Sequence, residues 1–168
     1  MGSDLPGSRC PVHCATCGLK MQTLREHHPY REAGLHRVIL CDINVSWCGR
    51  CGKSSLGIQR RDLLHRVIAE LLTSKPARLM GSEIRYLRRS VGLSETDLAK
   101  RVGVTIETVS RWEAATKVMR LPAERLLRLL VALELKIRCP VLEGVGTAPA
   151  EDLAVRLAWN GEDWASVA

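Results

Sequence analysis

The chain has 168 residues, enough for one ordinary domain or two small ones, and a formal net charge of +7. No signal peptide opens it and no apolar stretch is long enough to cross a membrane, so the sequence predicts a cytoplasmic protein without a membrane partner. The charge is uneven, since residues 1–139 carry +11 and residues 140–168 carry −4. A basic body of this kind favours a polyanionic partner, with nucleic acid first.

After a flexible leader (1–13), four cysteines stand as two pairs, Cys14-x2-Cys17 and Cys48-x2-Cys51, each followed by glycine. Two such turns brought together supply the tetrahedral four-thiolate set that zinc prefers. The pattern therefore predicts one structural Zn²⁺ per chain, because four thiolates leave no open position for water or substrate. The alternative is free thiols or disulfides, but seven cysteines are an odd number and their spacing is typical of a metal site. Cys10 and His13 are less favoured as ligands, because they lack a matching spacer and glycine.

Between the two pairs, residues 35–47 are rich in β-branched side chains, with Asp42 and Asn44 offering turn chemistry. The alternating residues are Ile39, Cys41, Ile43, Val45 and Trp47. We expect one or two short strands here and a polar loop at His27 and His28. Residues 14–60 are thus predicted to form a small zinc-ribbon-like α+β module.

A linking helix is predicted next, within residues 61–78. Leucine, valine and isoleucine recur with helical spacing between Arg61 and Thr73, and Lys75-Pro76 ends the helix because the residue before proline avoids the helical region. The apolar stripe must cover the metal module, the next domain or a partner chain.

Residues 79–139 are predicted to form a string of short helices. The first ends at Gly92, the second starts after Ser94, and the third starts after Thr105. Pro122 opens a longer, leucine-rich helix. Beyond it, residues 140–168 are expected to form an acidic tail of uncertain order, with one short helix near 152–158.

The second and third of these helices have the spacing of a helix-turn-helix. Ala99 provides the small residue at the helix crossing, Gly103 the turn and Val109 the inward anchor of the second helix. The helix after Thr105 is then the recognition helix. The residues expected to contact DNA bases are Thr105, Ile106, Glu107, Thr108 and Arg111. Those expected to contact the phosphate backbone are Lys100 and Arg101, together with Arg88, Arg89, Lys117 and Arg120.

These patterns predict a mainly α fold, in which a C-terminal helix-turn-helix bundle follows the small metal module. They favour a sequence-specific DNA-binding transcriptional regulator, most simply a repressor. A zinc-dependent adaptor that binds proteins, without sequence-specific DNA binding, is the alternative. An enzyme is not expected, because the sequence has no Ser/His/Asp or Cys/His arrangement, phosphate loop or open metal site.

Residues 81–133 resemble the λ-repressor/Cro-type helix-turn-helix domain, most clearly at 84–89, at Gly92-Leu93-Ser94 and at Ser110-Arg111-Trp112-Glu113. With the cysteine pairs ahead of it, the whole of residues 14–135 resembles the zinc-finger antitoxins of the MqsA (YgiT-type) class. The 30 residues between the pairs, the Glu32-Ala33-Gly34-Leu35 stretch and the Cys51-Gly52-Lys53 ending support this resemblance.

The resemblance implies a type II toxin–antitoxin pair, in which the N-terminal module holds one structural zinc through Cys14, Cys17, Cys48 and Cys51 and can mask a toxin ribonuclease. It further implies a homodimer that binds palindromic operator DNA in the bacterial nucleoid and represses its own operon. Arg111 aligns with a base-reading arginine of the family. The family has asparagine at the Glu107 position, so the operator sequence is expected to differ.

Overall fold

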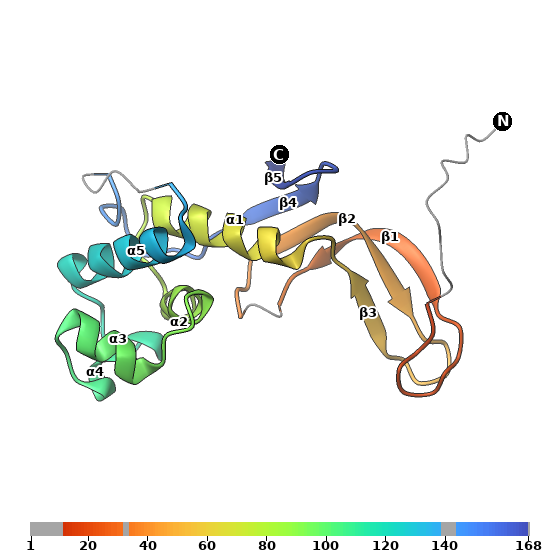
Figure 1. Cartoon of the computed structure of the whole chain (residues 1–168), viewed down its shortest axis with the longest axis horizontal. Coiled ribbons are helices and arrows are strands. Elements are labelled where there is room, and N and C mark those ends of the chain that lie inside the picture. Colours follow the sequence, from red (N-terminus) through yellow and green to blue (C-terminus); the bar gives the residue numbers. More distant parts are fainter. Residues whose placement is uncertain (1–11, 32–33, 139–143, 168) are drawn as a thin grey trace.

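The computed structural model describes residues 12–31, 34–138 and 144–167. In this described part the molecule is elongated, with helices gathered at one end, one helix running from them to the middle, and a sheet that reaches the other end (Figure 1). The helices are α1 (Arg61–Ser74), α2 (Gly81–Ser90), α3 (Glu95–Val102), α4 (Ile106–Glu113) and α5 (Leu121–Leu135). The strands are β1 (Gln22–Pro29), β2 (Val38–Trp47), β3 (Ser54–Gly57), β4 (Val155–Trp159) and β5 (Trp164–Val167).

Strand β2 organises the sheet, whose order is β1-β2-β4-β5 with β3 also paired to β2. Its first half, 38–41, pairs with β4 in parallel, and its second half, 44–47, pairs with β3 antiparallel. The change of partner falls at Asp42, which has a positive φ of 57° and lies opposite an irregularity in β1. The backbone N–H of Asp42 donates to His27 Nδ1 across this bulge.

The strand predicted within residues 35–47 is confirmed, but the predicted alternation is only partly right. Before the bulge Val38 and Leu40 are buried, and after it Ile43 and Val45 are buried. Ile39 is only half-buried, because the extra residue at Asp42 shifts the period of two. Trp47 is in phase with Ile43 and Val45 but is exposed at the end of the strand. The loop expected at His27 and His28 is in fact part of β1.

The short helix predicted near 152–158 is wrong, since this segment contains β4. Its residues Val155, Leu157 and Trp159 alternate, and Leu157 is fully buried where β4 lies beside β2. The hairpin of β4 and β5 is anchored by Trp164, whose Nε1 donates to the backbone carbonyl of Gln59 at 2.9 Å. With five strands beside five helices, the fold is a mixture of α and β and is not mainly α.

The five helices begin and end close to the predicted residues. Ser94 caps α3 by accepting from the N–H of Asp97, and Thr105 caps α4 by accepting from the N–H of Thr108. Gly103 has the left-handed backbone that the turn between α3 and α4 requires, with φ of 74°. Pro122 lies in the first turn of α5. None of the described helices combines the length and apolar character needed to span a membrane.

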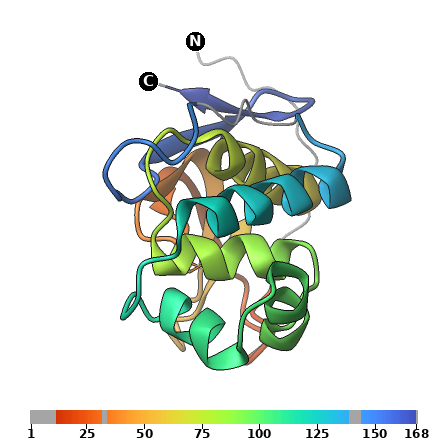
Figure 2. The same cartoon turned by 90° about the vertical axis from the view of Figure 1, so that its left-hand side faces the viewer.

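The main hydrophobic core of the described residues runs from the sheet through α1 into the helical bundle. Helix α1 buries Leu64, Ile68 and Leu72, and it packs against α2, α5 and β5. The apolar stripe predicted for the linking helix therefore covers both parts of the molecule. Figure 2 shows the helical end in front, with the sheet behind it.

Candidate metal centre and nucleic-acid interface

The two cysteine pairs form equivalent turns at the end of the sheet farthest from the helices. In the first turn the N–H of Gly18 donates to the carbonyl of Cys14 at 2.8 Å, and in the second the N–H of Gly52 donates to Cys48 at 3.0 Å. Both glycines have positive φ, which favours glycine over other residues. The first turn precedes β1 and the second immediately follows β2. Because β1 and β2 are antiparallel neighbours, the start of β1 lies beside the end of β2, and the two turns meet there.

The four sulfur atoms gather around one point. Cys14 Sγ lies 3.5 Å from Cys51 Sγ, Cys17 Sγ lies 3.4 Å from Cys48 Sγ, and all four lie within 4.8 Å of one another. A zinc ion with Zn–S bonds of about 2.3 Å needs a tetrahedron of sulfurs with edges of about 3.8 Å. The cluster matches this size, so the four predicted ligands are brought together and could bind a metal ion.

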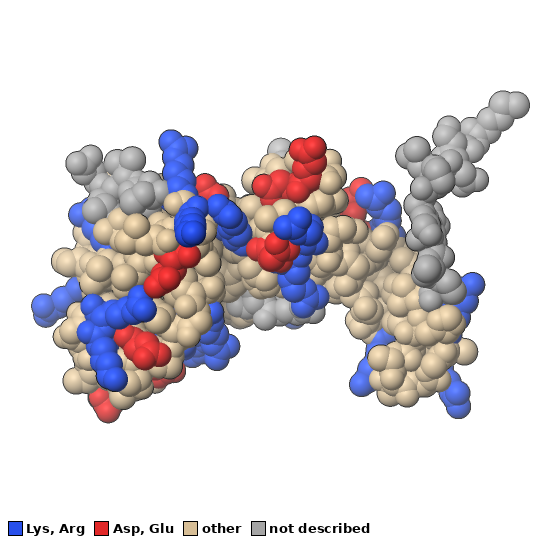
Figure 3. Space-filling model, viewed as in Figure 1, with Lys and Arg blue, Asp and Glu red and all other residues tan. Residues whose placement is uncertain are grey.

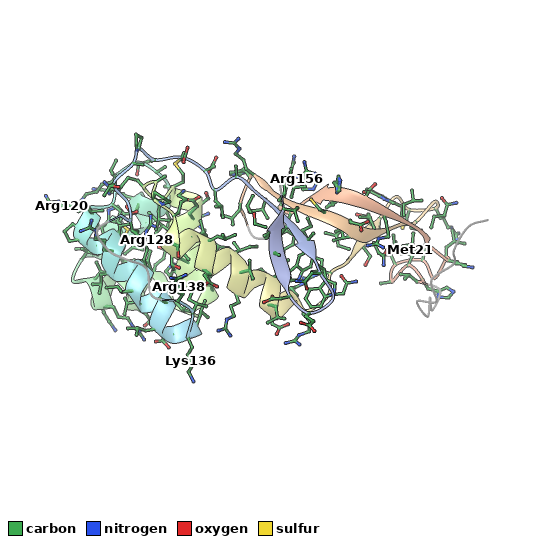
Figure 4. The ribbon with its side chains drawn as sticks, turned by 90° about the horizontal axis from the view of Figure 1, so that it is seen from above. Met21, Arg120, Arg128, Lys136, Arg138 and Arg156 are labelled. Carbon is green, nitrogen blue, oxygen red and sulfur yellow. The ribbon has the colours of Figure 1, made fainter. Side chains whose placement is uncertain are left out.

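The backbone around the cluster favours thiolates, the form of cysteine that binds metal. The N–H groups of Thr16 and Cys17 lower the pKa of Cys14 to about 6. Those of Cys51 and Arg50 likewise lower the pKa of Cys48. Without a metal ion the neighbouring sulfurs have the opposite effect on the other two cysteines, raising the pKa of Cys17 to about 12 and raising that of Cys51. Cys14, Met21 and Cys48 form a small buried cluster separate from the main core, and Cys17 packs against it. Figure 4 places Met21 at this far end of the sheet.

The other candidate ligand, His13, is exposed and forms an isolated bridge with Lys20, outside the four-sulfur cluster. Cys10 and Cys139 lie outside the described residues.

At the opposite end of the molecule, α3 and α4 form the helix-turn-helix pair. Ala99 and Val109 are both buried where the two helices cross, as their positions predict. The backbone N–H of Val104 donates to the carbonyl of Ala99 at 3.0 Å, closing the turn. Leu98 is fully buried and completes the inner face of α3.

The outer face of α4 is open to solvent. Thr105, Ile106, Glu107 and Arg111 are exposed, and the Ile106 side chain is 44% accessible although it is apolar. Thr108 is half-buried, and its hydroxyl lies 3.2 Å from that of Thr105. The pKa of Glu107 lies below its usual range, because the carboxylate accepts from its own backbone N–H and from Thr105 and is attracted by Arg111.

The basic residues predicted to contact phosphates divide into two groups. Lys100, Arg89, Lys117 and Arg120 are exposed, and so is Arg101, which forms an ion pair with Glu134 at 3.1 Å. Figure 3 shows Lys and Arg side chains projecting from the helical end of the molecule. Arg88 belongs to the second group, and its prediction is wrong. It is buried and donates through Nε to Glu113 Oε1 at 2.6 Å, which raises its pKa.

The Arg88–Glu113 pair joins α2 to the end of α4, and the side chain of Arg85 reaches the same carboxylate at 3.1 Å. Sequence reasoning missed the role of Glu113, because a glutamate at the end of a short helix resembles any solvent-facing residue.

A second buried ion cluster was also missed. The guanidinium of Arg128 is fully buried on α5 and donates to the carbonyls of Leu72, Thr73, Lys75 and Ala77, and to Glu124 (Figure 4). It thus caps the C-terminal end of α1 and fixes that end on the helix-turn-helix bundle. The sequence does carry a signal for this cluster, because Glu124 and Arg128 lie four residues apart in a leucine-rich helix, a spacing that favours an ion pair.

Comparisons with known proteins give one match. A family model described as the antitoxin component of a bacterial toxin–antitoxin system, MqsA, matches residues 8–135. The match includes both cysteine pairs and all five helices and ends before β4 and β5. Neither the curated proteins nor the solved structures gave a match.

Proposed function

This chain belongs to the MqsA family of antitoxin components of bacterial toxin–antitoxin systems, and we propose that it is also a sequence-specific DNA-binding repressor of its own operon. The observation that carries the proposal is the exposed face of α4. Its side chains project from a helix that Ala99 and Val109 hold firmly against α3. The second helix of such a pair is the one that enters the major groove.

In this arrangement Arg111 reads a base edge, since arginine can donate two hydrogen bonds to guanine. The exposed Ile106 suits contact with a thymine methyl, and the ionised Glu107 can accept from the amino group of cytosine. Lys100 and Arg101, at the end of α3, position the protein on the phosphates.

The apolar stripe on the outer face of α5 supports the proposal of a homodimer. Leu126, Leu129, Leu130 and Leu133 recur at helical spacing, and Leu126 and Leu133 are exposed. A second copy packed on this stripe would present two recognition helices related by a two-fold axis. The operator is therefore expected to be palindromic, with half-sites about one helical turn apart.

The sheet end of the molecule is proposed to hold one structural zinc and to mask the toxin, expected to be a ribonuclease. Leu19, Leu24 and Trp47 are exposed near the cysteine cluster, and Leu24 is 64% accessible. Apolar side chains exposed together in this way suit a protein partner. The four-thiolate cluster offers no open coordination position, which favours a binding protein over an enzyme. The proposed location is the bacterial cytoplasm.

Fluorescence anisotropy with the DNA upstream of its own operon tests the repressor function. We expect tight binding at physiological salt that falls steeply as salt rises, because phosphate contacts release counterions. The upstream sequence, shuffled, is the matched control and is expected to bind much more weakly. Equal binding to both sequences, or no binding, would contradict the repressor function and favour the zinc-dependent adaptor that binds proteins.

A further inference from the structure

A cavity of about 840 Å³ lies where the sheet meets the helical bundle. Its walls come from four places in the chain. Arg31 and Gly34 belong to the connection between β1 and β2, and the remaining lining residues come from α1, α2 and the end of α5. Its volume lies within the range of pockets that bind small molecules, about 300–1,000 Å³. Neither the metal cluster nor the recognition helix contributes to it.

The cavity wall is strongly basic. Four of its described residues are arginines, namely Arg31, Arg66, Arg85 and Arg89. Arg85 is paired with Glu113, outside the lining, and Arg66 donates to the backbone carbonyl of Lys136. The wall has two carboxylates, Asp62 and Glu134, and each is paired with an arginine that is not part of the lining.

These outside partners neutralise the carboxylates. Arg60 lies 2.9 Å from Asp62 and holds the pKa of that carboxyl below its usual range, and Arg101 lies 3.1 Å from Glu134. The positive charge of the wall is thus left in excess. Glu32, next to Arg31 in sequence, lies outside the described residues.

The rest of the lining is apolar or aromatic. Leu63 and Leu135 line it together with the rings of His65 and Tyr86. The His65 ring is fixed, since Nε2 lies 3.1 Å from the Tyr30 hydroxyl and Nδ1 lies 2.9 Å from the Tyr86 hydroxyl. The site therefore offers a preorganised surface for a flat, partly apolar group within a wall that also carries arginines.

We propose that this cavity binds a small phosphorylated molecule of the nucleotide class. Arginine forks match phosphate oxygens in pairs, and Arg31, Arg66 and Arg89 together suit more than one phosphate group. The apolar and aromatic surface suits a planar base. Duplex DNA is a poorer occupant of this cavity than a free nucleotide. The bases of a duplex are stacked and paired, so they cannot enter a recess.

The proposal does not depend on the repressor function, and calorimetry tests it directly. The purified full-length, zinc-loaded protein is titrated with ATP and with inorganic pyrophosphate at about 150 mM salt, where exposed charge pairs are largely screened. We expect micromolar binding of ATP and at least about tenfold weaker binding of pyrophosphate, which lacks the base. No binding of ATP at millimolar concentration, or equal affinity for both, would overturn the proposal.

Variants locate the site. Arg31→Ala and Arg89→Ala are each expected to weaken ATP binding about tenfold or more, as the loss of a charge-assisted hydrogen bond predicts. Arg156→Ala, at an exposed arginine on β4 outside the cavity lining, is the matched control and should leave ATP binding unchanged. Circular dichroism and zinc content check that each variant is folded. If a random duplex displaces ATP and its own binding shows the same dependence on Arg31 and Arg89, these arginines belong to a DNA surface and the proposal fails.

Discussion

Arginine has three different roles in this molecule, and burial separates them. Arg111 is exposed on α4, Arg88 is buried against a carboxylate, and Arg128 is fully buried against carbonyl groups. Only the first is available to a nucleic acid. A guanidinium that keeps its charge in all three places needs partners wherever water is excluded, and the structure supplies them to the two buried ones.

Arg111→Ala is expected to weaken specific DNA binding by about 1–3 kcal/mol and to relax the preference at one base position per half-site. Lys100→Ala is the control, and should weaken binding to all sequences alike and flatten the salt dependence. Selection of preferred sites from a random DNA library measures both effects. An unchanged preferred sequence for Arg111→Ala would show that the recognition helix is wrongly assigned.

Arg88→Met should destabilise the fold by about 3 kcal/mol or more, because it leaves Glu113 buried with only the more exposed Arg85 as partner. The adjacent Arg89 is exposed, so Arg89→Met is expected to cost less than about 0.5 kcal/mol. Urea denaturation of the two variants makes the comparison. Equal stabilities would contradict the structural role of the Arg88–Glu113 pair.

At the scale of elements, the sequence predicts the helices well and the sheet only partly. The bounds of α3 and α4 follow from Ser94, Gly103 and Thr105, whose effects act within a few residues of the chain. The four cysteines are likewise placed by local spacing and a known coordination chemistry. Strand β4 is different, because its partner β2 is distant in the sequence and all five helices lie between the two strands. No local pattern indicates such a partner.

The β4–β5 hairpin is expected to contribute to stability and not to form a loose tail. Trp164→Ala should cost about 3–5 kcal/mol, because it removes a buried side chain that packs near α1 and donates to Gln59. Val167→Ala, on the same strand but exposed, should cost much less. Thermal or chemical denaturation tests the pair, and a native-like Trp164→Ala would mean that the hairpin is dispensable.

At the scale of the whole molecule, the two ends differ in what holds them together. The helices and β2 from Val38 to Val45 share one core, whereas the cysteine turns have only a small cluster of their own. We therefore expect the far end of the sheet to depend on the proposed zinc more than the rest of the chain does. The main core includes side chains of both β2 and α1, so the sheet and the linking helix pack against each other across their boundary in the sequence.

Removal of zinc should loosen residues 14–24 and 46–56 while the core around α1 remains folded. A structural zinc contributes about 10–16 kcal/mol of apparent binding energy in small modules, and here that energy acts on the far end of the sheet. Hydrogen exchange before and after chelation measures the effect. Cys48→Ser should lose the metal, while Cys41→Ala, at a buried cysteine outside the cluster, should retain one zinc per chain. Tight zinc binding by Cys48→Ser would disprove the ligand assignment.

The parallel pairing of β2 with β4 has a consequence for biosynthesis. The ribosome makes the edge of β2 at residues 38–41 early, but its partner at 155–158 emerges only after the whole helical bundle. An apolar strand edge without a partner invites pairing with other chains, so the nascent protein is most exposed to aggregation during this interval. The cysteine turns face no such delay, since all four thiols have been made once Cys51 emerges. Zinc can therefore close one end of the sheet long before translation provides the strand that completes the other.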